Sequence, residues 1–200
     1  MKKYYEEFEE IIKSLDGKKK LLLHSCCAPC SSSVLERLKD YFDVTVYYYN
    51  PNIAPFSEFE RRLKEQITLL EKLKIKYIIG EYEPEEFSFA IKGYETYPEG
   101  SERCKHCYYF RMRNLAKLAK ENNFDFFTTT LSVSPHKNAV WINEIGKELE
   151  NEFGVKFLTS DFKKKNGYLR SLELSREYGL YRQEYCGCRP RKENCDTDKN

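Results

Sequence analysis

The stretch Leu21–Ser33, LLLHSCCAPCSSS, decides the fold and carries the most reactive side chains of the chain. Its first residues, up to His24, form a short apolar run that is typical of a buried strand. Three cysteines follow within the quoted stretch. The sequence predicts that a helix begins in the serines, because Ser33 and Glu36 have the spacing of a capping box. The thiols would then lie at the carboxyl end of a strand, beside amide N–H groups that favour thiolates.

Four further segments rich in β-branched or aromatic residues predict strands at 43–49, 77–79, 124–131 and 155–159. Between these segments, apolar residues recur at helical spacing. Five strands that alternate with helices predict an α/β fold with a single doubly wound, mostly parallel five-stranded sheet. Ligands bind at the carboxyl edge of such a sheet, where the cysteine-rich loops would lie. We expect one domain over residues 1–200, with 191–200 as a flexible tail.

The composition limits the partners and the compartment. The net charge of the 200 residues is +2, so a nucleic acid would have to bind through a local basic patch. No run of about 18 apolar residues is present, which predicts no membrane span. The first ten residues, MKKYYEEFEE, are charged and lack the apolar core of a signal peptide. These observations predict a cytoplasmic protein.

Eight cysteines in a cytoplasmic protein favour metal binding or redox chemistry over disulfides, because this compartment keeps thiols reduced. Seven of them fall into three groups of closely spaced thiols, which can chelate one centre. These seven are Cys26, Cys27, Cys30, Cys104, Cys107, Cys186 and Cys188. Seven thiols exceed the needs of one tetrahedral zinc ion. Four would hold an iron–sulfur cluster and leave three for a second metal or for redox chemistry, whereas Cys195 lies in the polar tail and is left out.

The residue types alone leave the kind of site open. Zinc and an iron–sulfur cluster both accept thiolates, so a structural four-cysteine zinc site with further buried cysteines is one alternative. A thioredoxin-like dithiol is another, because Cys27 and Cys30 form a CxxC between a strand and a helix. The additional cysteines and the order of five strands and helices argue against the dithiol.

A few other side chains could act as ligands or acids. His24 and His136 are candidates for both roles, although His24, at the end of a strand, could equally be a hydrogen-bonded structural residue. Asp161 follows the last predicted strand, where it could bind a metal, donate a proton or cap a helix. Tyr168 and Tyr185 could stack on a base or donate a proton, or belong to the core.

Basic residues near the predicted loops form a candidate RNA-binding patch. Lys137 lies in the polar loop SVSPHKN, and three lysines lie in the loop FKKKNGY at 162–168. The predicted RNA-binding residues are Lys137, Lys163, Lys164, Arg170 and Arg189. A solvated basic turn is the simpler interpretation of the lysine run.

The order of these motifs resembles that of the QueH-type epoxyqueuosine reductases. The matching motifs extend from Leu21 to Pro190, and the three cysteine groups together are far more specific than any one of them. The motifs that carry the resemblance are HSCCAPC at 24–30, NPNI at 50–53, the pair Cys104 and Cys107, SPHKN at 134–138, DFKK at 161–164 and YCGC at 185–188.

The resemblance implies a Rossmann-like fold of the nucleotide-hydrolase type, although the chain lacks an SGGxDS-like phosphate loop, so ATP use is not expected. It implies reduction of epoxyqueuosine to queuosine at the wobble position of tRNA with a GUN anticodon, the last step of queuosine biosynthesis, without cobalamin. It further implies a [4Fe–4S] cluster, an adjacent mononuclear iron and an electron donor that the sequence does not identify.

Removal of an epoxide oxygen requires two electrons, protons and a Lewis acid on the oxygen. We therefore expect the seven cysteines to divide between the cluster and the iron, with Asp161 as an additional ligand. The candidate proton donors are Asp161, His136 and Tyr168. Two alternative functions stay open at this point: a zinc-stapled RNA-binding module and a CxxC thiol–disulfide oxidoreductase.

Overall fold

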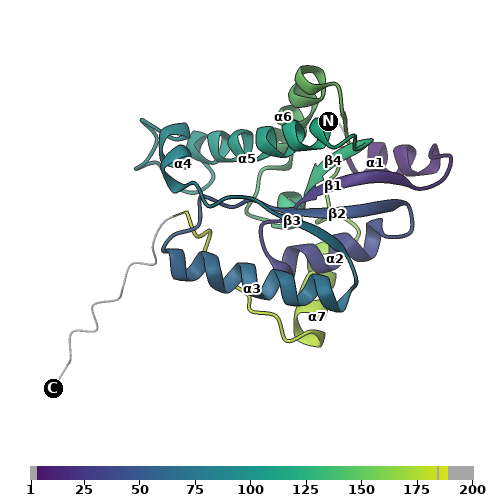
Figure 1. Ribbon diagram of the computed structural model, residues 1–200, viewed down its shortest axis with the longest axis horizontal. Coiled ribbons are helices and arrows are strands. Elements are labelled where there is room, and N and C mark those ends of the chain that lie inside the picture. Colours follow the sequence, from purple (N-terminus) through teal and green to yellow (C-terminus); the bar gives the residue numbers. More distant parts are fainter. Residues whose placement is uncertain (1–3, 184, 189–200) are drawn as a thin grey trace.

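The computed structural model describes residues 4–183 and 185–188 (Figure 1). Its five strands form one sheet in the order β3-β2-β1-β4-β5, and every neighbouring pair is parallel. The strands are β1 (Lys19–His24), β2 (Phe42–Tyr48), β3 (Lys76–Ile79), β4 (Phe126–Thr129) and β5 (Lys156–Phe157). The predicted fold class is confirmed. The predicted tail at 191–200 and Arg189 lie outside the described residues.

Helices cover both faces of the sheet because β1 buries side chains on each side. Leu22 belongs to the core beneath α5 (Glu102–Glu121) and α6 (Ala139–Phe153). Leu21 and Leu23 point to the opposite core, which α1 (Tyr4–Lys13), α2 (Ala28–Leu38), α3 (Phe56–Lys72) and α7 (Gly167–Glu177) help to close. Figure 1 shows α5 and α6 above the sheet and α2, α3 and α7 below it. Complete burial of each leucine contributes about 1.5–3 kcal/mol.

The strand order creates a switch point beside β1. The chain builds outward from β1 to β2 and β3, and then crosses to the other side of β1 to form β4 and β5. The loops that follow β1 and β4 therefore leave the sheet in opposite directions, which opens a crevice at its carboxyl edge. The cysteine loop contacts the short 3₁₀ helix η1 (Thr130–Val133) after β4, since the Cys26 amide donates to Thr130 Oγ1 at 3.2 Å.

The predicted start of the helix after β1 is wrong. The helix α2 begins at Ala28, with Cys27 as its N-cap residue, so Ser33 lies within the helix and does not cap it. Pro29 explains the difference, because its fixed φ suits the first helical turn and its missing N–H costs nothing there. As a consequence Cys27 and Cys30 lie within the first turn of α2, nearer to its free amides than the sequence interpretation places them.

Two strands are shorter than predicted. The strand β4 ends at Thr129, where η1 takes over, and β5 comprises only two residues. Leu158 amide still donates to the carbonyl of Phe127 at 2.9 Å, so the chain continues beside β4 without a full ladder. A short helix, α4 (Pro84–Ala90), precedes the loop that leads to α5.

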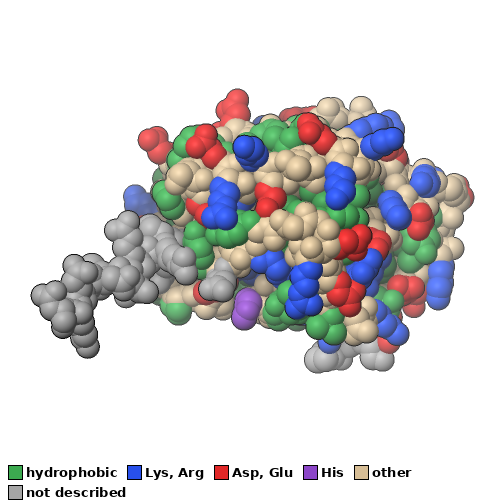
Figure 2. Space-filling view, turned by 90° about the horizontal axis from the view of Figure 1, so that it is seen from below, with side chains coloured by type: hydrophobic (Ala, Val, Ile, Leu, Met, Phe, Trp, Pro, Cys, Tyr) green, Lys and Arg blue, Asp and Glu red, His purple; other side chains and the backbone are tan. Residues whose placement is uncertain are grey.

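The surface agrees with the nearly balanced charge. Figure 2 shows the face below α3 and α7, where lysine and arginine side chains are interspersed with acidic ones. Within residues 4–183 and 185–188, no helix has the length and apolar character that crossing a membrane requires.

Candidate active site

A cavity of about 410 Å³ opens at the carboxyl edge of the sheet. Its walls include the loop after β1, the loop after η1 and residues 182, 183, 185 and 186 near the C-terminus, which come from distant parts of the sequence. Cys26, Cys27 and Cys30 line one part of the cavity and Cys186 lines another. The volume lies within the range of small-molecule sites, which is about 300–1,000 Å³.

The first thiol group is compact. The sulfur atoms of Cys26, Cys27 and Cys30 all lie within 4.8 Å of one another. Cys26 Sγ and Cys27 Sγ are 3.8 Å apart. A tetrahedral metal with metal–sulfur bonds of about 2.3 Å holds its sulfur ligands about 3.8 Å apart, so this pair has the spacing of two ligands of one metal atom.

The three thiols share protons unequally. Hydrogen bonds from the thiols of Cys27 and Cys30 hold the pKa of Cys26 well below its usual value, and Thr130 Oγ1 also donates to Cys26 Sγ at 3.5 Å. The same hydrogen bond to Cys26 raises the pKa of Cys27 to about 12. The pKa of Cys30 is raised for the same reason. Cys26 is therefore the thiol of this group that ionises most readily, and the thiolate is the form that binds metals.

A second thiol group comprises Cys107, Cys186 and Cys188, of which Cys186 lines the cavity. Cys107, on α5, is buried in an apolar cluster with Phe87 and Ile91, and Cys188 packs against this cluster. Donation from the Cys188 thiol holds the pKa of Cys186 well below its usual value. Cys186 Sγ also accepts a hydrogen bond from Lys137 Nζ at 3.2 Å.

Lys137 also lines the cavity. Burial alone would lower the pKa of its ammonium group, but the Cys186 thiolate beside it raises that pKa above the usual value. Glu99 also forms an ion pair with Lys137, with 2.7 Å between Lys137 Nζ and Glu99 Oε1. The role predicted for Lys137 in RNA binding stays a prediction, and the structure directs its side chain to a thiolate and a carboxylate.

Cys104 is buried one turn before Cys107, and its sulfur accepts a hydrogen bond from the Gly100 amide at 3.3 Å. Among the described residues, only Cys26, Cys27 and Cys30 form a set of three metal-binding side chains that are close enough to hold one ion. The structure thus brings together the first thiol group, places Cys186 on the same cavity, and joins Cys107 and Cys188 in one cluster.

A buried polar network holds the cysteine loop, and the sequence interpretation missed most of it. Asn50 Nδ2 donates to the carbonyl of Ser25 at 2.8 Å, and Arg111 Nη1 donates to Asn50 Oδ1 at 3.0 Å. Gln66 Oε1 accepts from the hydroxyls of Ser25 and Ser31. One signal was available, because Arg111 follows Cys107 by four residues and therefore shares its helix face.

His24 is a structural residue. It is completely buried, and its Nδ1 and Nε2 atoms lie 2.9 Å from Thr129 Oγ1 and 3.1 Å from the carbonyl of Tyr49. Burial lowers its pKa to about 3, so the ring is neutral. Of the two interpretations of His24, the hydrogen-bonded one is correct, because both ring nitrogens are occupied by the ends of neighbouring strands.

Replacing His24 with leucine should lower the free energy of unfolding by about 2–4 kcal/mol, because the Thr129 hydroxyl and the Tyr49 carbonyl lose their buried partner. His24→Gln, which can restore one of these bonds, should lose about half as much. Urea unfolding followed by circular dichroism measures both values. Equal stability of wild type and His24→Leu would show that the two bonds are not required.

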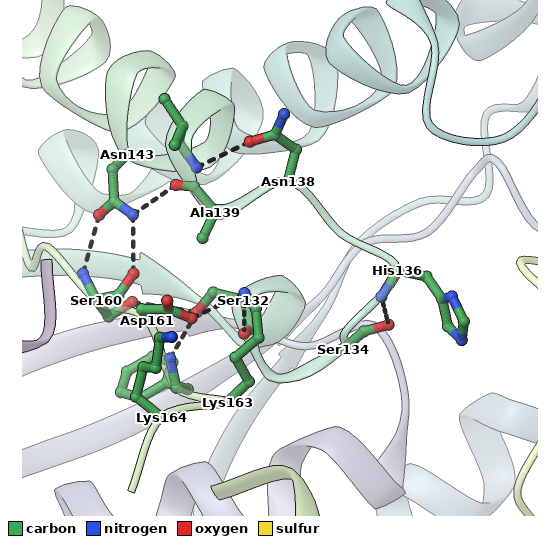
Figure 3. Close-up of polar contacts among 12 residues, drawn as sticks. Ser132, Ser134, His136, Asn138, Ala139, Asn143, Ser160, Asp161, Lys163 and Lys164 are labelled. Carbon is green, nitrogen blue, oxygen red and sulfur yellow. Dashed lines mark hydrogen bonds and ion pairs between the residues drawn. The ribbon is translucent and has the colours of Figure 1, made fainter. Parts of the chain in front are cut away.

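Two of the predicted proton donors line the cavity and one does not. Tyr168 and His136 line the cavity. Asp161 is not one of the described residues that line it. Asp161 pairs with Lys163 Nζ at 2.8 Å. Figure 3 shows it beside Ser160, in a group of polar side chains separated from His136. The roles predicted for Asp161 as metal ligand and acid stay predictions.

The predicted basic patch is largely neutralised by acidic partners. Arg170 forms ion pairs with Glu36 and Glu173, and Lys163 is paired with Asp161. Lys164 is exposed, and its carbonyl accepts from Arg37 at 3.2 Å. The remaining member of the patch, Arg189, is outside the described residues. RNA binding by these side chains stays a prediction.

Comparison with known proteins gives one consistent result. Residues 21–193 match the family model described as "Epoxyqueuosine reductase QueH". A Staphylococcus epidermidis protein of that name is 46% identical over 182 residues, which cover 86% of this chain and 76% of the relative. The Thermotoga maritima protein of the same name is 39% identical over 171 residues, which cover 84% of this chain and 88% of the relative.

Proposed function

This chain belongs to the QueH family of epoxyqueuosine reductases, and from that premise we propose that it reduces epoxyqueuosine in tRNA to queuosine, at the cavity described above. The reaction removes one oxygen atom. Both carbon–oxygen bonds of the epoxide break, a carbon–carbon double bond forms, and two electrons and two protons convert the oxygen to water.

The observation that carries this proposal is the arrangement of thiols around one cavity. Three sulfur atoms within 4.8 Å of one another lie on the same cavity as a fourth thiol, Cys186, which accepts a hydrogen bond from the partly buried Lys137. The residues fit a thiophilic metal centre, because thiolates select iron–sulfur clusters and zinc over hard cations. The close spacing of Cys26 and Cys27 supports the same conclusion.

We assign the two thiol groups to the two parts of the expected cofactor without dividing them further. Cys26, Cys27 and Cys30 would hold one part, and Cys107, Cys186 and Cys188 would contribute to the other. When bound, a [4Fe–4S] cluster with an adjacent iron supplies the electrons and a Lewis acid for the epoxide oxygen. Asp161 would need to leave Lys163 before it could become a further ligand.

The side chains of this chain supply the other requirements. Tyr168 and His136 line the cavity and can each donate a proton toward the oxygen that leaves. Arg182, whose guanidinium carbon lies 5.8 Å from the centre of the Tyr168 ring, holds this ring from one side. Arg62 and Arg111 add buried positive charge to the walls, which favours the thiolate forms of the cysteines.

The test is reduction of epoxyqueuosine-containing tRNA by anaerobically purified protein with dithionite as electron source, followed by nucleoside analysis. We expect queuosine to form, and we expect the protein to be brown, with absorbance at about 400 nm that bleaches on reduction. A colourless zinc protein would contradict the iron–sulfur centre. An iron-loaded protein that leaves epoxyqueuosine unchanged would contradict the reaction.

Two variants separate the proton donors. If Tyr168 donates the proton, Tyr168→Phe should lower the rate of the chemical step by about 100-fold or more, and His136→Gln should change it by less than about threefold. The reverse pattern would assign the role to His136. Single-turnover reduction with unchanged iron and sulfide content measures the rate, and equal rates in both variants and wild type would exclude both residues.

A further inference from the structure

A second groove lies outside the cavity, between α3 and the segment that follows α7. It has a volume of about 290 Å³ and is lined by Arg61, Lys64, Glu65, Thr68, Leu69, Lys72, Tyr178, Gly179 and Leu180. None of the predicted RNA-binding residues that the structure describes lines it, and the chemistry of the cavity does not use it. We propose that this groove binds phosphates of the tRNA substrate, an inference that rests on the proposed function.

The positive charge of the groove comes from one stripe of α3. Arg61, Lys64 and Lys72 are all exposed, and positions 61, 64, 68 and 72 repeat at helical spacing. The stripe extends about 17 Å along the helix axis, which is long enough to contact more than one phosphate. Figure 2 shows that the face of the molecule below α3 and α7 carries side chains of both signs of charge.

Two tyrosines hold Arg61 and Lys72 in place. The guanidinium carbon of Arg61 lies 3.5 Å from the centre of the Tyr181 ring, and Lys72 Nζ lies 4.6 Å from the centre of the Tyr178 ring. Such contacts reduce the freedom of the side chains without neutralising their charge. This arrangement differs from that of Arg170, whose charge is matched by two carboxylates. Among the described residues Lys64 and Lys72 have no ion pair, and Arg61 interacts with the single carboxylate of Glu65, so the stripe keeps a net positive charge that is suited to phosphate contacts.

Among the described residues that line the groove, Glu65 is the one with a carboxylate, and it already accepts a hydrogen bond. Glu65 Oε1 accepts a hydrogen bond from the Tyr181 amide. This bond ties the segment after α7 to α3 and thereby fixes the wall of the groove. The same carboxylate also interacts with the Arg61 guanidinium and offsets part of its charge, so two of the three positive charges of the stripe remain in excess.

The groove and the cavity are built from the same two segments of the chain. Arg61 lines the groove, while its neighbour Arg62 lines the cavity. The chain segment that provides Tyr178 to the groove goes on to provide Arg182 and Gln183 to the cavity. An RNA strand with one base in the cavity would therefore have its adjoining backbone along α3, where the cations are.

The test compares tRNA binding by the triple variant Arg61→Ala, Lys64→Ala, Lys72→Ala with binding by wild type. The probe is a fluorescent tRNA transcript with a GUN anticodon, measured by anisotropy at several salt concentrations. At about 0.15 M salt we expect the affinity to fall about 30- to 100-fold, and the slope of log K against log salt to fall by about 2–3, because each lost contact removes about 0.7–0.9.

The matched control removes three exposed lysines elsewhere. Lys13, Lys120 and Lys156 lie near the amino edge of the sheet, at the ends of α1 and α5 and at the start of β5. The triple alanine variant at these positions carries the same charge change and should bind tRNA as wild type does. Equal weakening in both triple variants would overturn the inference in favour of a general charge effect. Unchanged affinity in the groove variant would overturn it too.

Two further experiments serve as controls, one for folding and one for the proposed function. If the triple variant loses metal or unfolds, the double variant Lys64→Gln, Lys72→Gln replaces it in the test, because this variant keeps the contact between Arg61 and Tyr181. We expect the double variant to bind tRNA about 10- to 20-fold more weakly than wild type. An unchanged affinity would overturn the inference. Reduction of a short epoxyqueuosine-containing oligonucleotide should proceed at the wild-type maximal rate in the variants. Failure of the wild type itself to reduce this substrate would contradict the proposed function, whereas the binding result reports on the groove independently.

Discussion

Replacing Cys26 with alanine should eliminate reductase activity, with a loss of at least about 100-fold, and should lower the iron and sulfide content of the purified protein. Among the three thiols of its group, Cys26 is the one whose pKa is lowered. It accepts hydrogen bonds from the two neighbouring thiols and from Thr130. Alanine removes the sulfur that the other two thiols contact, and no other histidine, cysteine, aspartate or glutamate among the described residues joins this set to replace it. Iron and sulfide analysis and single-turnover reduction measure the two effects.

Cys195→Ala is the matched control, because the sequence interpretation leaves this cysteine outside the metal-binding set. It should have the metal content and the rate of wild type. Simultaneous replacement of Cys186 and Cys188 should also reduce both quantities. Full metal content and full activity after that double change would show that the C-terminal thiols do not contribute, and would restrict the centre to the loop after β1.

Gly167→Ala should destabilise the protein by about 3 kcal/mol, which lowers Tm by about 6–12 °C for a chain of this length. A Cβ atom at this position would lie 1.8 Å from the carbonyl oxygen of Phe162. This neighbour is backbone, so no side chain can rotate away. The loop 162–166 or the start of α7 must move, and Tyr168, which lines the cavity, would move with it.

Leu169→Ala provides the comparison, because Leu169 is 54% exposed and lies two residues further along the same helix. This change should alter the free energy of unfolding by less than about 0.5 kcal/mol. Thermal unfolding followed by circular dichroism gives both values. A Tm of Gly167→Ala within about 2 °C of wild type would show that the close approach to Phe162 is relieved at no cost.

The basic residues show where reasoning from the sequence fails. Arg170 and Lys163 are part of a cluster of cations in the sequence, yet each has an acidic partner in the structure. The partner Glu36 lies 134 residues from Arg170. By contrast, Arg61 and Lys64 stand among glutamates in the sequence of α3, which hid their common face with Tyr178 and Tyr181. Charge pairing between distant segments decides which cations remain available.

The sequence by itself determined the fold class and the thiol chemistry. Apolar runs that alternate with helical patterns specify a parallel sheet, because such strands can be buried only between two layers of helices. Cysteines one to three residues apart must also lie close together in any fold, so Cys26, Cys27 and Cys30 were recognisable as one group. The tertiary structure alone decided what faces that group. It placed Cys186 on the same cavity and Arg111 on Asn50, because these contacts depend on how separate elements pack and no local spacing encodes them.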